Sequence, residues 1–116
     1  MKKIIYTDKA PAPIGPYNQG VLTGNTLYTS GQIALNPVTM QLVMDSIEEE
    51  TKQVMENLKA VLEAAGMTFE NVIKTTIFIM NMGDFARINE VYGSYFNEKT
   101  APARETVQVA CSPKNV

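Results

Sequence analysis

The sequence predicts an α/β protein in which a mixed β-sheet carries two helices on one face. Three observations predict this class: an N-terminal hairpin signal, a long amphipathic segment in the middle, and a second half that alternates strand and helix patterns. Strand–helix–strand connections are right-handed, so both helices should cover the same face of the sheet. We expect residues 1–116 to form one domain, because a chain of 116 residues can bury most of its surface without a metal or disulfide.

The chain begins with a short strand and a stiff loop. Lys3–Thr7 contains strand-forming residues, and three prolines in Asp8–Tyr17 exclude regular structure there. A loop with few unfolded conformations loses little entropy when it becomes ordered. It can therefore present Tyr17 at a fixed position, although a tyrosine that packs the loop onto the core fits the residues equally well.

A hairpin follows the loop. Gly24–Asn25 is a two-residue spacer between Gln19–Thr23 and Thr26–Ser30, which is typical of a tight antiparallel turn. The second strand ends at Ser30, and Gly31 permits a bulge or a close approach of the backbone at that point. On its own, Ser30 is more typical of a structural hydroxyl than of a catalytic group.

The middle of the chain predicts a helix from Ser46, its N-cap, to Gly66, which ends it. Glu49 stands three residues after Ser46, as in a capping box. Small or apolar residues then recur at spacings of three and four, namely Ile47, Thr51, Val54, Met55, Leu58, Val61, Leu62 and Ala65. This stripe indicates packing against a sheet and not a cofactor site.

The second half predicts a further strand and a second helix. Val72–Met80 is apolar at odd and even positions, which is typical of a strand covered on both faces. Asp84 is expected to cap the second helix. One face of that helix carries Phe85, Ile88, Tyr92, Tyr95 and Phe96. Asn89 lies on the flank of this face, where an amide is a structural tie by default or, alternatively, part of a site.

The last strand is expected at Thr106–Cys111, where apolar and polar residues alternate. Pro102 restricts the chain just before it, so Arg104 should be held at the mouth of this strand. A guanidinium binds a carboxylate or phosphate through two parallel hydrogen bonds. The alternative is a surface arginine that pairs with Glu105 or stays in water. Cys111 is expected to be a small buried side chain without a reactive role.

The residue inventory excludes several kinds of catalysis. The chain has no histidine and one cysteine, so it cannot form a Ser-His-Asp triad, a Cys-His pair, a histidine-ligated zinc site or a thiolate metal site. We therefore expect no metal. The remaining groups suit a substrate that is already reactive and needs positioning and charge stabilisation more than a strong nucleophile.

Charge and hydropathy restrict the partners. Ten basic and twelve acidic residues give a net charge of -2 without a basic cluster, which disfavours nucleic-acid binding. No apolar run reaches membrane-spanning length, and a lone cysteine without a secretory signal predicts a cytoplasmic protein. Two helices on one face leave the other face of the sheet bare, so we expect the protein to self-associate.

Six segments follow one another along nearly the whole chain: Ile14–Gly20, Thr29–Ile33, Asn57–Gly66, Val72–Thr76, Asp84–Tyr92 and Ala101–Arg104. Together they resemble the Rid family of reactive intermediate deaminases, also called YjgF or L-PSP proteins and, in older names, translation initiation inhibitors. Each segment is weak evidence alone. Six of them in order and at compatible spacing are specific.

The resemblance implies a chorismate-mutase-like fold and a homotrimer with a central β-barrel and active sites between subunits. It also implies hydrolysis of 2-aminoacrylate and related imines, such as 2-iminobutanoate and 2-iminopropanoate, to 2-keto acids and ammonia. By the same resemblance Arg104, Tyr17 and Ser30 are catalytic, with Arg104 clamping the substrate carboxylate, and Asn89 and Gly31 help to bind the substrate. No cofactor is expected, because pyridoxal phosphate belongs to the enzyme that supplies the imine.

The chain departs from the family pattern at two places. Glu105 stands where the family usually has serine, and its carboxylate would weaken the clamp unless it points to the opposite face of the strand. Family chains also continue through another strand with a glutamate thought to orient water or a proton. That glutamate has no counterpart up to Val116. Either the sequence is truncated or altered near Cys111–Pro113, or the molecule lacks this part of the pocket and of the sheet.

Two other functions stay open. The first is a non-catalytic binder of small carboxylates such as 2-keto acids, at the subunit interface. The second is the ribonuclease or translation-inhibitor role attached to some family names. It ranks last, because the sequence offers no histidine, no basic groove and no metal cluster.

Overall fold

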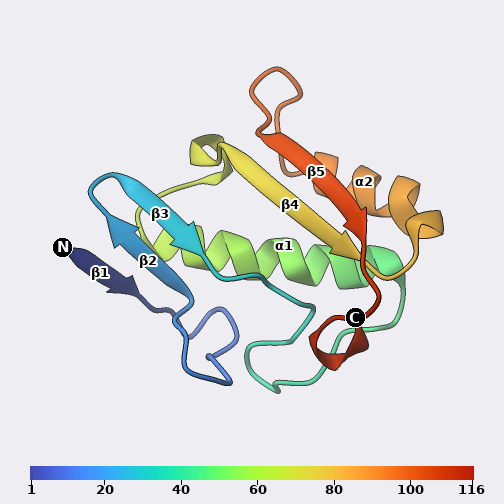
Figure 1. Cartoon of the computed structure of the whole chain (residues 1–116), viewed down its shortest axis with the longest axis horizontal. Helices are drawn as coiled ribbons and strands as arrows, with labels where there is room; N and C mark the ends of the chain where they lie inside the picture. Colours follow the sequence, from blue (N-terminus) through green and yellow to red (C-terminus); the bar gives the residue numbers. More distant parts are fainter.

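The computed structural model describes residues 1–116, and its strands form a layer in front of two helices (Figure 1). The strands are Lys2–Ile5 (β1), Gly20–Thr23 (β2), Thr26–Thr29 (β3), Lys74–Ile79 (β4) and Ala103–Gln108 (β5). The α-helices are Ile47–Ala64 (α1) and Phe85–Gly93 (α2), and short 3-10 helices cover Phe69–Asn71 (η1), Met82–Asp84 (η2) and Pro113–Asn115 (η3). The predicted fold class is confirmed, with both helices on the same side of the strands (Figure 1).

The N-terminal strands form an antiparallel sheet in the order β1-β2-β3. The turn between β2 and β3 is the predicted one, and Gly24 adopts a φ of 57°, which a glycine tolerates without strain. Gly20 lies opposite α1, and a Cβ there would come within 3.2 Å of Val61 Cγ1. This glycine therefore lets β2 pack closely on the helix, in a core that includes Ile5 and Val61.

The second half forms a parallel pair, β4 and β5, connected through α2. We predicted one mixed sheet, but the antiparallel and parallel parts form two separate hydrogen-bonded ladders. The parallel register places Thr75 opposite Arg104 and Thr76 opposite Glu105. Because successive strand residues point to opposite faces, this register decides which of the two charged side chains faces the helices.

The first helix begins where its cap predicts. The Ser46 hydroxyl accepts a hydrogen bond from the backbone N–H of Glu49 at 3.1 Å, and Gly66 follows the helix end with a φ of 73°. The predicted stripe packs inward, as at Met55 and Val61. Asn57 is also fully buried, although its amide gave no reason to place it in the core.

The start of α2 corrects one prediction. Asp84 precedes the helix, but its side chain makes no capping hydrogen bond. The cap lies one short turn earlier, where Asn81 Oδ1 accepts from the backbone N–H of Gly83 at 2.8 Å and begins η2. α2 is tied to α1 by Arg87, whose Nε and Nη2 donate to both carboxylate oxygens of Glu48. This hydrogen-bonded pair lowers the pKa of the Glu48 carboxyl.

The last strand begins and ends about three residues earlier than predicted. Pairing with β4 starts it at Ala103, so Arg104 lies inside β5 and not before it. The strand ends at Gln108, and Cys111 is exposed in the segment that follows. Our expectation of a buried Cys111 is therefore wrong, because the ladder that would have covered it ends before that residue.

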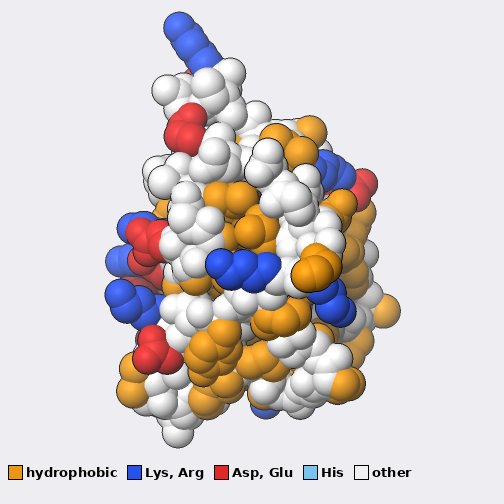
Figure 2. Space-filling view, turned by 90° about the vertical axis from the view of Figure 1, so that its left-hand side faces the viewer, with side chains coloured by type: hydrophobic (Ala, Val, Ile, Leu, Met, Phe, Trp, Pro, Cys, Tyr) orange, Lys and Arg blue, Asp and Glu red, His pale blue; other side chains and the backbone are white.

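One face of the strands has no helix over it. Phe78 of β4 is 62% exposed, and its register partner Val107 is also exposed. In the antiparallel sheet Ile4 and Tyr28 are exposed. Figure 2, viewed from the β1 side of the molecule, shows hydrophobic side chains over much of the surface. β4 is thus covered on one face only within a single chain, and not on both as its apolar sequence predicted.

Neither helix of the chain combines the length and the apolar character that a membrane-crossing segment requires.

Candidate functional site

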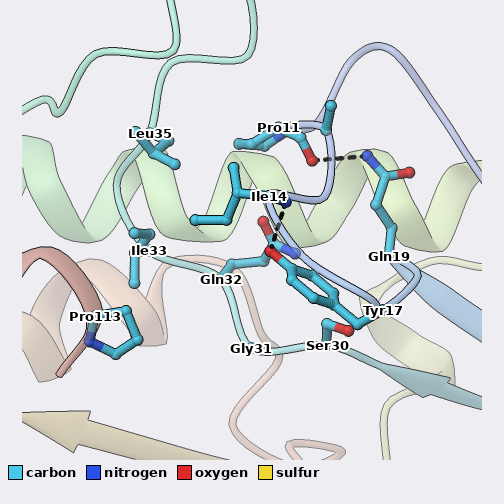
Figure 3. Close-up of a pocket in the computed structure, with 11 residues that line it drawn as sticks. Pro11, Ile14, Tyr17, Gln19, Ser30, Gly31, Gln32, Ile33, Leu35 and Pro113 are labelled. Carbon is cyan, nitrogen blue, oxygen red and sulfur yellow. Dashed lines mark hydrogen bonds between the residues drawn. The ribbon is translucent and has the colours of Figure 1, made fainter.

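A pocket of about 430 Å³ lies between the proline-rich loop and the segment that follows β3 (Figure 3). Three of the predicted site residues, Tyr17, Ser30 and Gly31, line it. Apolar side chains form much of the remaining wall, which includes Pro11, Ile14, Ile33, Leu35 and Pro113. The hairpin returns the chain to the loop and so brings Ser30 and Gly31 beside Tyr17.

Gln19 holds the loop in place. Its side chain is 2% exposed, and its Oε1 accepts from the backbone N–H of Thr7 at 2.7 Å. Its Nε2 lies within hydrogen-bond distance of three carbonyl oxygens, those of Thr7, Ala10 and Pro11, at 2.9, 3.2 and 2.9 Å. A loop that lacks a ladder needs such partners for its buried polar backbone. The fixed position expected for Tyr17 thus depends on this amide as well as on the prolines.

Asn57 fixes the opposite wall. Its Nδ2 donates to the carbonyls of Ile33 and Leu35 at 3.1 and 2.9 Å, and its Oδ1 accepts from Gln53 Nε2 at 2.8 Å. Asn57 is fully buried on α1, so the helix holds the segment that lines the pocket. Sequence reasoning missed both Gln19 and Asn57, because nothing local distinguishes a buried amide from an exposed one.

The two hydroxyls of the pocket differ in whether their donor or their acceptor capacity for hydrogen bonds is unused. The Ser30 hydroxyl donates to the Asn18 carbonyl at 2.6 Å, so its proton is engaged and its lone pairs are free to accept. The Tyr17 hydroxyl accepts a long bond of 3.4 Å from the backbone N–H of Ile14 (Figure 3). The Tyr17 proton is therefore free to be donated into the pocket.

Arg104 and Asn89 form a second group. Arg104 Nη1 donates to Asn89 Oδ1 at 2.5 Å, and Arg104 Cζ lies 5.1 Å from the centroid of the Tyr92 ring and 5.5 Å from that of Phe85. None of the ion pairs of the chain includes Arg104. Its positive charge thus has amide and aromatic contacts but no carboxylate to neutralise it, which leaves the fork free to bind an anion.

Glu105 points away from this group. Its carboxylate lies 3.4 Å from Lys74 Nζ and accepts from the Thr76 hydroxyl at 3.3 Å, on the face without helices. The alternation of the strand separates the two neighbouring charges. The surface pairing considered between Arg104 and Glu105 is therefore absent, and Asn89 is a tie to the arginine.

One chain does not bring the two groups together. The pocket is lined by Tyr17, Ser30 and Gly31 but not by Arg104 or Asn89. In Figure 1 the loop between β1 and β2 lies at the bottom of the view, whereas β5 begins at the top. The single chain therefore carries two separate groups of candidate residues, which we call the pocket half-site (Tyr17, Ser30 and Gly31) and the arginine half-site (Arg104 and Asn89).

Thr106 adds a group that sequence reasoning did not single out. It follows Arg104 by two residues on β5, so both side chains point to the same face. Its hydroxyl is buried without a hydrogen-bond partner. A buried orphan hydroxyl costs stability, whereas an apolar group of the same shape does not.

We expect Thr106→Val to stabilise the fold by about 1 kcal/mol, or roughly 4 °C in Tm, because it removes an unpaired polar group. Thermal unfolding followed by circular dichroism measures this change. Thr76→Val is the matched control, because it deletes a hydroxyl that does bond, to Glu105. Equal Tm changes in the two variants would contradict the account of Thr106.

The fold and the candidate residues together define a class, that of small α/β domains with a pocket beside a proline-rich loop and an arginine outside any ion pair. The family described as Endoribonuclease L-PSP matches residues 7–116. A mouse protein named 2-iminobutanoate/2-iminopropanoate deaminase is 47% identical over 114 residues, which cover 98% of this chain and 84% of the mouse protein. The chain therefore belongs to the Rid (YjgF, L-PSP) family.

Solved structures agree with this assignment. The Rid-family protein YyfA of Yersinia pestis matches with a TM-score of 0.95 and 45% identity, covering 99% of this chain and 91% of that chain. TdcF of E. coli, solved with bound serine, matches with a TM-score of 0.91 and 45% identity, covering 97% and 90%. The fold is thus shared over nearly all of the described residues.

Proposed function

We propose that this protein hydrolyses reactive 2-imino acids and their enamine tautomers, of the 2-aminoacrylate type, to 2-keto acids and ammonia. The observation that carries the proposal is the unpaired guanidinium of Arg104, held by Asn89 and two aromatic rings. A 2-imino acid has a carboxylate that such a fork can bind in bidentate fashion. The names of the mouse relative and of its rat counterpart, which is also 47% identical, support the same chemistry.

The reaction needs little from the protein. Water adds to the imine carbon, a proton passes to the nitrogen, and the resulting carbinolamine expels ammonia and leaves a ketone. Arg104 would hold the carboxylate, and the free proton of Tyr17 would serve the nitrogen. Ser30 has lone pairs that would orient the attacking water, because its own proton is bonded to Asn18. Because the imine carbon is already electrophilic, positioning of this kind can accelerate the reaction, and no side chain has to act as a nucleophile.

The proposed site lies between subunits of a homotrimer. Two features support this arrangement: the pocket and arginine half-sites are separate within one chain, and the strands expose an apolar face. An exposed apolar patch of this kind is typical of an oligomer interface. Association that buries the strands would bring the arginine half-site of one subunit beside the pocket half-site of the next.

Phe78→Asp should therefore give monomers and abolish imine hydrolysis, because it places a charge on the exposed apolar face. Light scattering coupled to size-exclusion chromatography measures the oligomeric state. Val38→Asp is the control, since Val38 is more exposed still, at 88%, but lies in the loop after β3. A Phe78→Asp protein that remains an active oligomer would contradict the interfacial site.

A coupled assay tests the activity itself. A pyridoxal-phosphate-dependent serine dehydratase releases 2-aminoacrylate, and added protein should speed the appearance of pyruvate and ammonia above the spontaneous rate. The acceleration should be proportional to protein concentration at a fixed amount of dehydratase. Pyruvate formation at the spontaneous rate, with folded oligomeric protein present, would refute the proposal.

A non-catalytic binder of small carboxylates is the second candidate. The observation that favours it is the serine bound to TdcF, a relative with the same fold. Both functions require Arg104, so binding alone does not separate them. Saturable binding of 2-ketobutyrate without any acceleration of 2-aminoacrylate hydrolysis would select the binder.

Ribonuclease activity, which the family description names, ranks third. On the face drawn in Figure 2 the basic side chains are interspersed with acidic and apolar ones and do not form a continuous stripe. Proteins that grip a phosphate backbone normally concentrate Lys and Arg on one surface. RNA cleavage that persists after repurification and is lost in Arg104→Ala would reverse this ranking.

A further inference from the structure

The guanidinium of Arg104 lies against one face of α2. Phe85, Asn89 and Tyr92 occupy positions i, i+4 and i+7 of that helix, which share a face. Arg104 contacts all three: a hydrogen bond to the Asn89 amide, and ring centroids 5.5 Å (Phe85) and 5.1 Å (Tyr92) from Cζ. The arginine is therefore supported over two turns of the helix although its residue as a whole is exposed.

Tyr92 is itself held from the strand. It is 8% exposed, and its hydroxyl lies 2.7 Å from Thr75 Oγ1. Thr75 is the register partner of Arg104 in the β4–β5 ladder. Phe96 packs against the same ring, with 4.8 Å between centroids. The ring that supports the guanidinium thus has a hydrogen bond at its tip and a packed neighbour, and cannot move without losing both.

The contacts of Arg104 leave part of its fork open. Asn89 engages Nη1, whereas Nε and Nη2 make no hydrogen bond within the chain. An aromatic face attracts a cation without competing for its hydrogen-bond donors. A long side chain that is already ordered also loses less entropy when it binds. Support by Tyr92 therefore favours anion binding without occupying the donors that the anion needs.

We propose that Tyr92, fixed by Thr75, is a positioning residue that presents Arg104 to the substrate carboxylate. This inference rests on the proposed function. It names the side chains that orient Arg104, the proposed clamp. Tyr92 acts through the arginine and does not touch the substrate. Because Tyr92 contributes to substrate binding, its loss should weaken binding of the ground state and of the transition state by the same amount.

Two substitutions of Tyr92 separate the ring from the hydroxyl. Tyr92→Leu removes the ring, and we expect KM for 2-aminoacrylate and Kd for 2-ketobutyrate to rise about five- to tenfold with kcat nearly unchanged. Tyr92→Phe keeps the ring and should restore most of the affinity. Thr75→Val should match Tyr92→Phe, and the double variant should be no worse than either, because both delete the same hydrogen bond.

Tyr95→Leu is the matched control. Tyr95 also carries a hydrogen-bonded hydroxyl, 2.7 Å from Glu56 Oε2, and it packs on Phe69. Its ring makes no contact with Arg104. The substitution should lower Tm, as Tyr92→Leu does, while Kd for 2-ketobutyrate stays at the wild-type value.

The Nε–H resonance of Arg104, assigned by its loss in Arg104→Lys, gives a readout that does not depend on catalysis. We expect it to shift in Tyr92→Leu and to stay in place in Tyr95→Leu. A wild-type protein that hydrolyses the imine, with a Tyr92→Leu variant of unchanged Kd and unchanged Arg104 resonance, would overturn this inference alone. A wild-type protein that neither binds 2-ketobutyrate nor hydrolyses the imine would overturn the proposed function and this inference together.

Discussion

Arg104→Ala should lower kcat/KM for 2-aminoacrylate hydrolysis by about 100-fold or more, because it removes a charged bidentate contact to the substrate. The loss should be of activity and not of fold. Arg104 is exposed, forms no ion pair and contributes one hydrogen bond, to Asn89. The coupled dehydratase assay measures the activity, and thermal unfolding and light scattering measure the fold and the oligomer.

Two variants control for this experiment. Arg104→Lys keeps the charge but loses the planar fork, so we expect it to recover only part of the activity. Arg87→Ala removes another exposed arginine, which pairs with Glu48, and should leave the hydrolysis rate unchanged. Ammonia release at the wild-type rate by Arg104→Ala would remove the basis of the proposed mechanism.

Gln19→Leu should have the largest effect on stability of any substitution considered. It keeps the approximate volume of the side chain but leaves four backbone groups unpaired, on Thr7, Ala10 and Pro11. Each buried unpaired group costs about 1–3 kcal/mol, and partial relaxation toward water reduces the sum. We expect the free energy of unfolding to fall by about 3–5 kcal/mol and Tm by roughly 10–20 °C.

Urea unfolding followed by circular dichroism measures this loss. Gln41→Leu is the control, because Gln41 is exposed and its side chain makes no hydrogen bond within the chain. It should change the free energy of unfolding by less than about 0.5 kcal/mol. Similar midpoints for Gln19→Leu and the wild type would show that water can replace the Gln19 amide and that the loop does not depend on it.

Local chemistry made part of this fold predictable. Ser46 caps α1 through its own side chain, and Gly24–Asn25 forms the two-residue turn of the β2–β3 hairpin. Such signals work because every atom involved lies within about four residues along the chain. The end of α1 at Gly66 follows for the same reason.

Distant partners explain what could not be predicted. Gln19 bonds to groups 8 to 12 residues away, and Asn57 bonds to carbonyls 22 and 24 residues away. Neither residue has a local pattern that marks it as buried. β5 begins at Ala103 for a similar reason, since the next residues, Arg104 and Glu105, are charged and join the strand through pairing with β4.

The candidate site was predicted in part by residue type and in part by resemblance. An arginine after a proline loop is a local signal for Arg104, but its aromatic support comes from α2 and required the structure. The residues of the pocket half-site came from the resemblance alone, and their position beside one another required the structure. The assignment of these residues to catalysis and substrate binding stays a prediction.

The register of β5 against β4 decides the sign of the charge that α2 faces. A slip of one residue would exchange the faces of Arg104 and Glu105, so that a carboxylate would lie over the rings of Phe85 and Tyr92 and an arginine beside Lys74. Both outcomes are repulsive, because the ring face is electron-rich and the two cations repel. The opposite charges of the neighbours Arg104 and Glu105 thus disfavour a slip of one residue between the parallel strands.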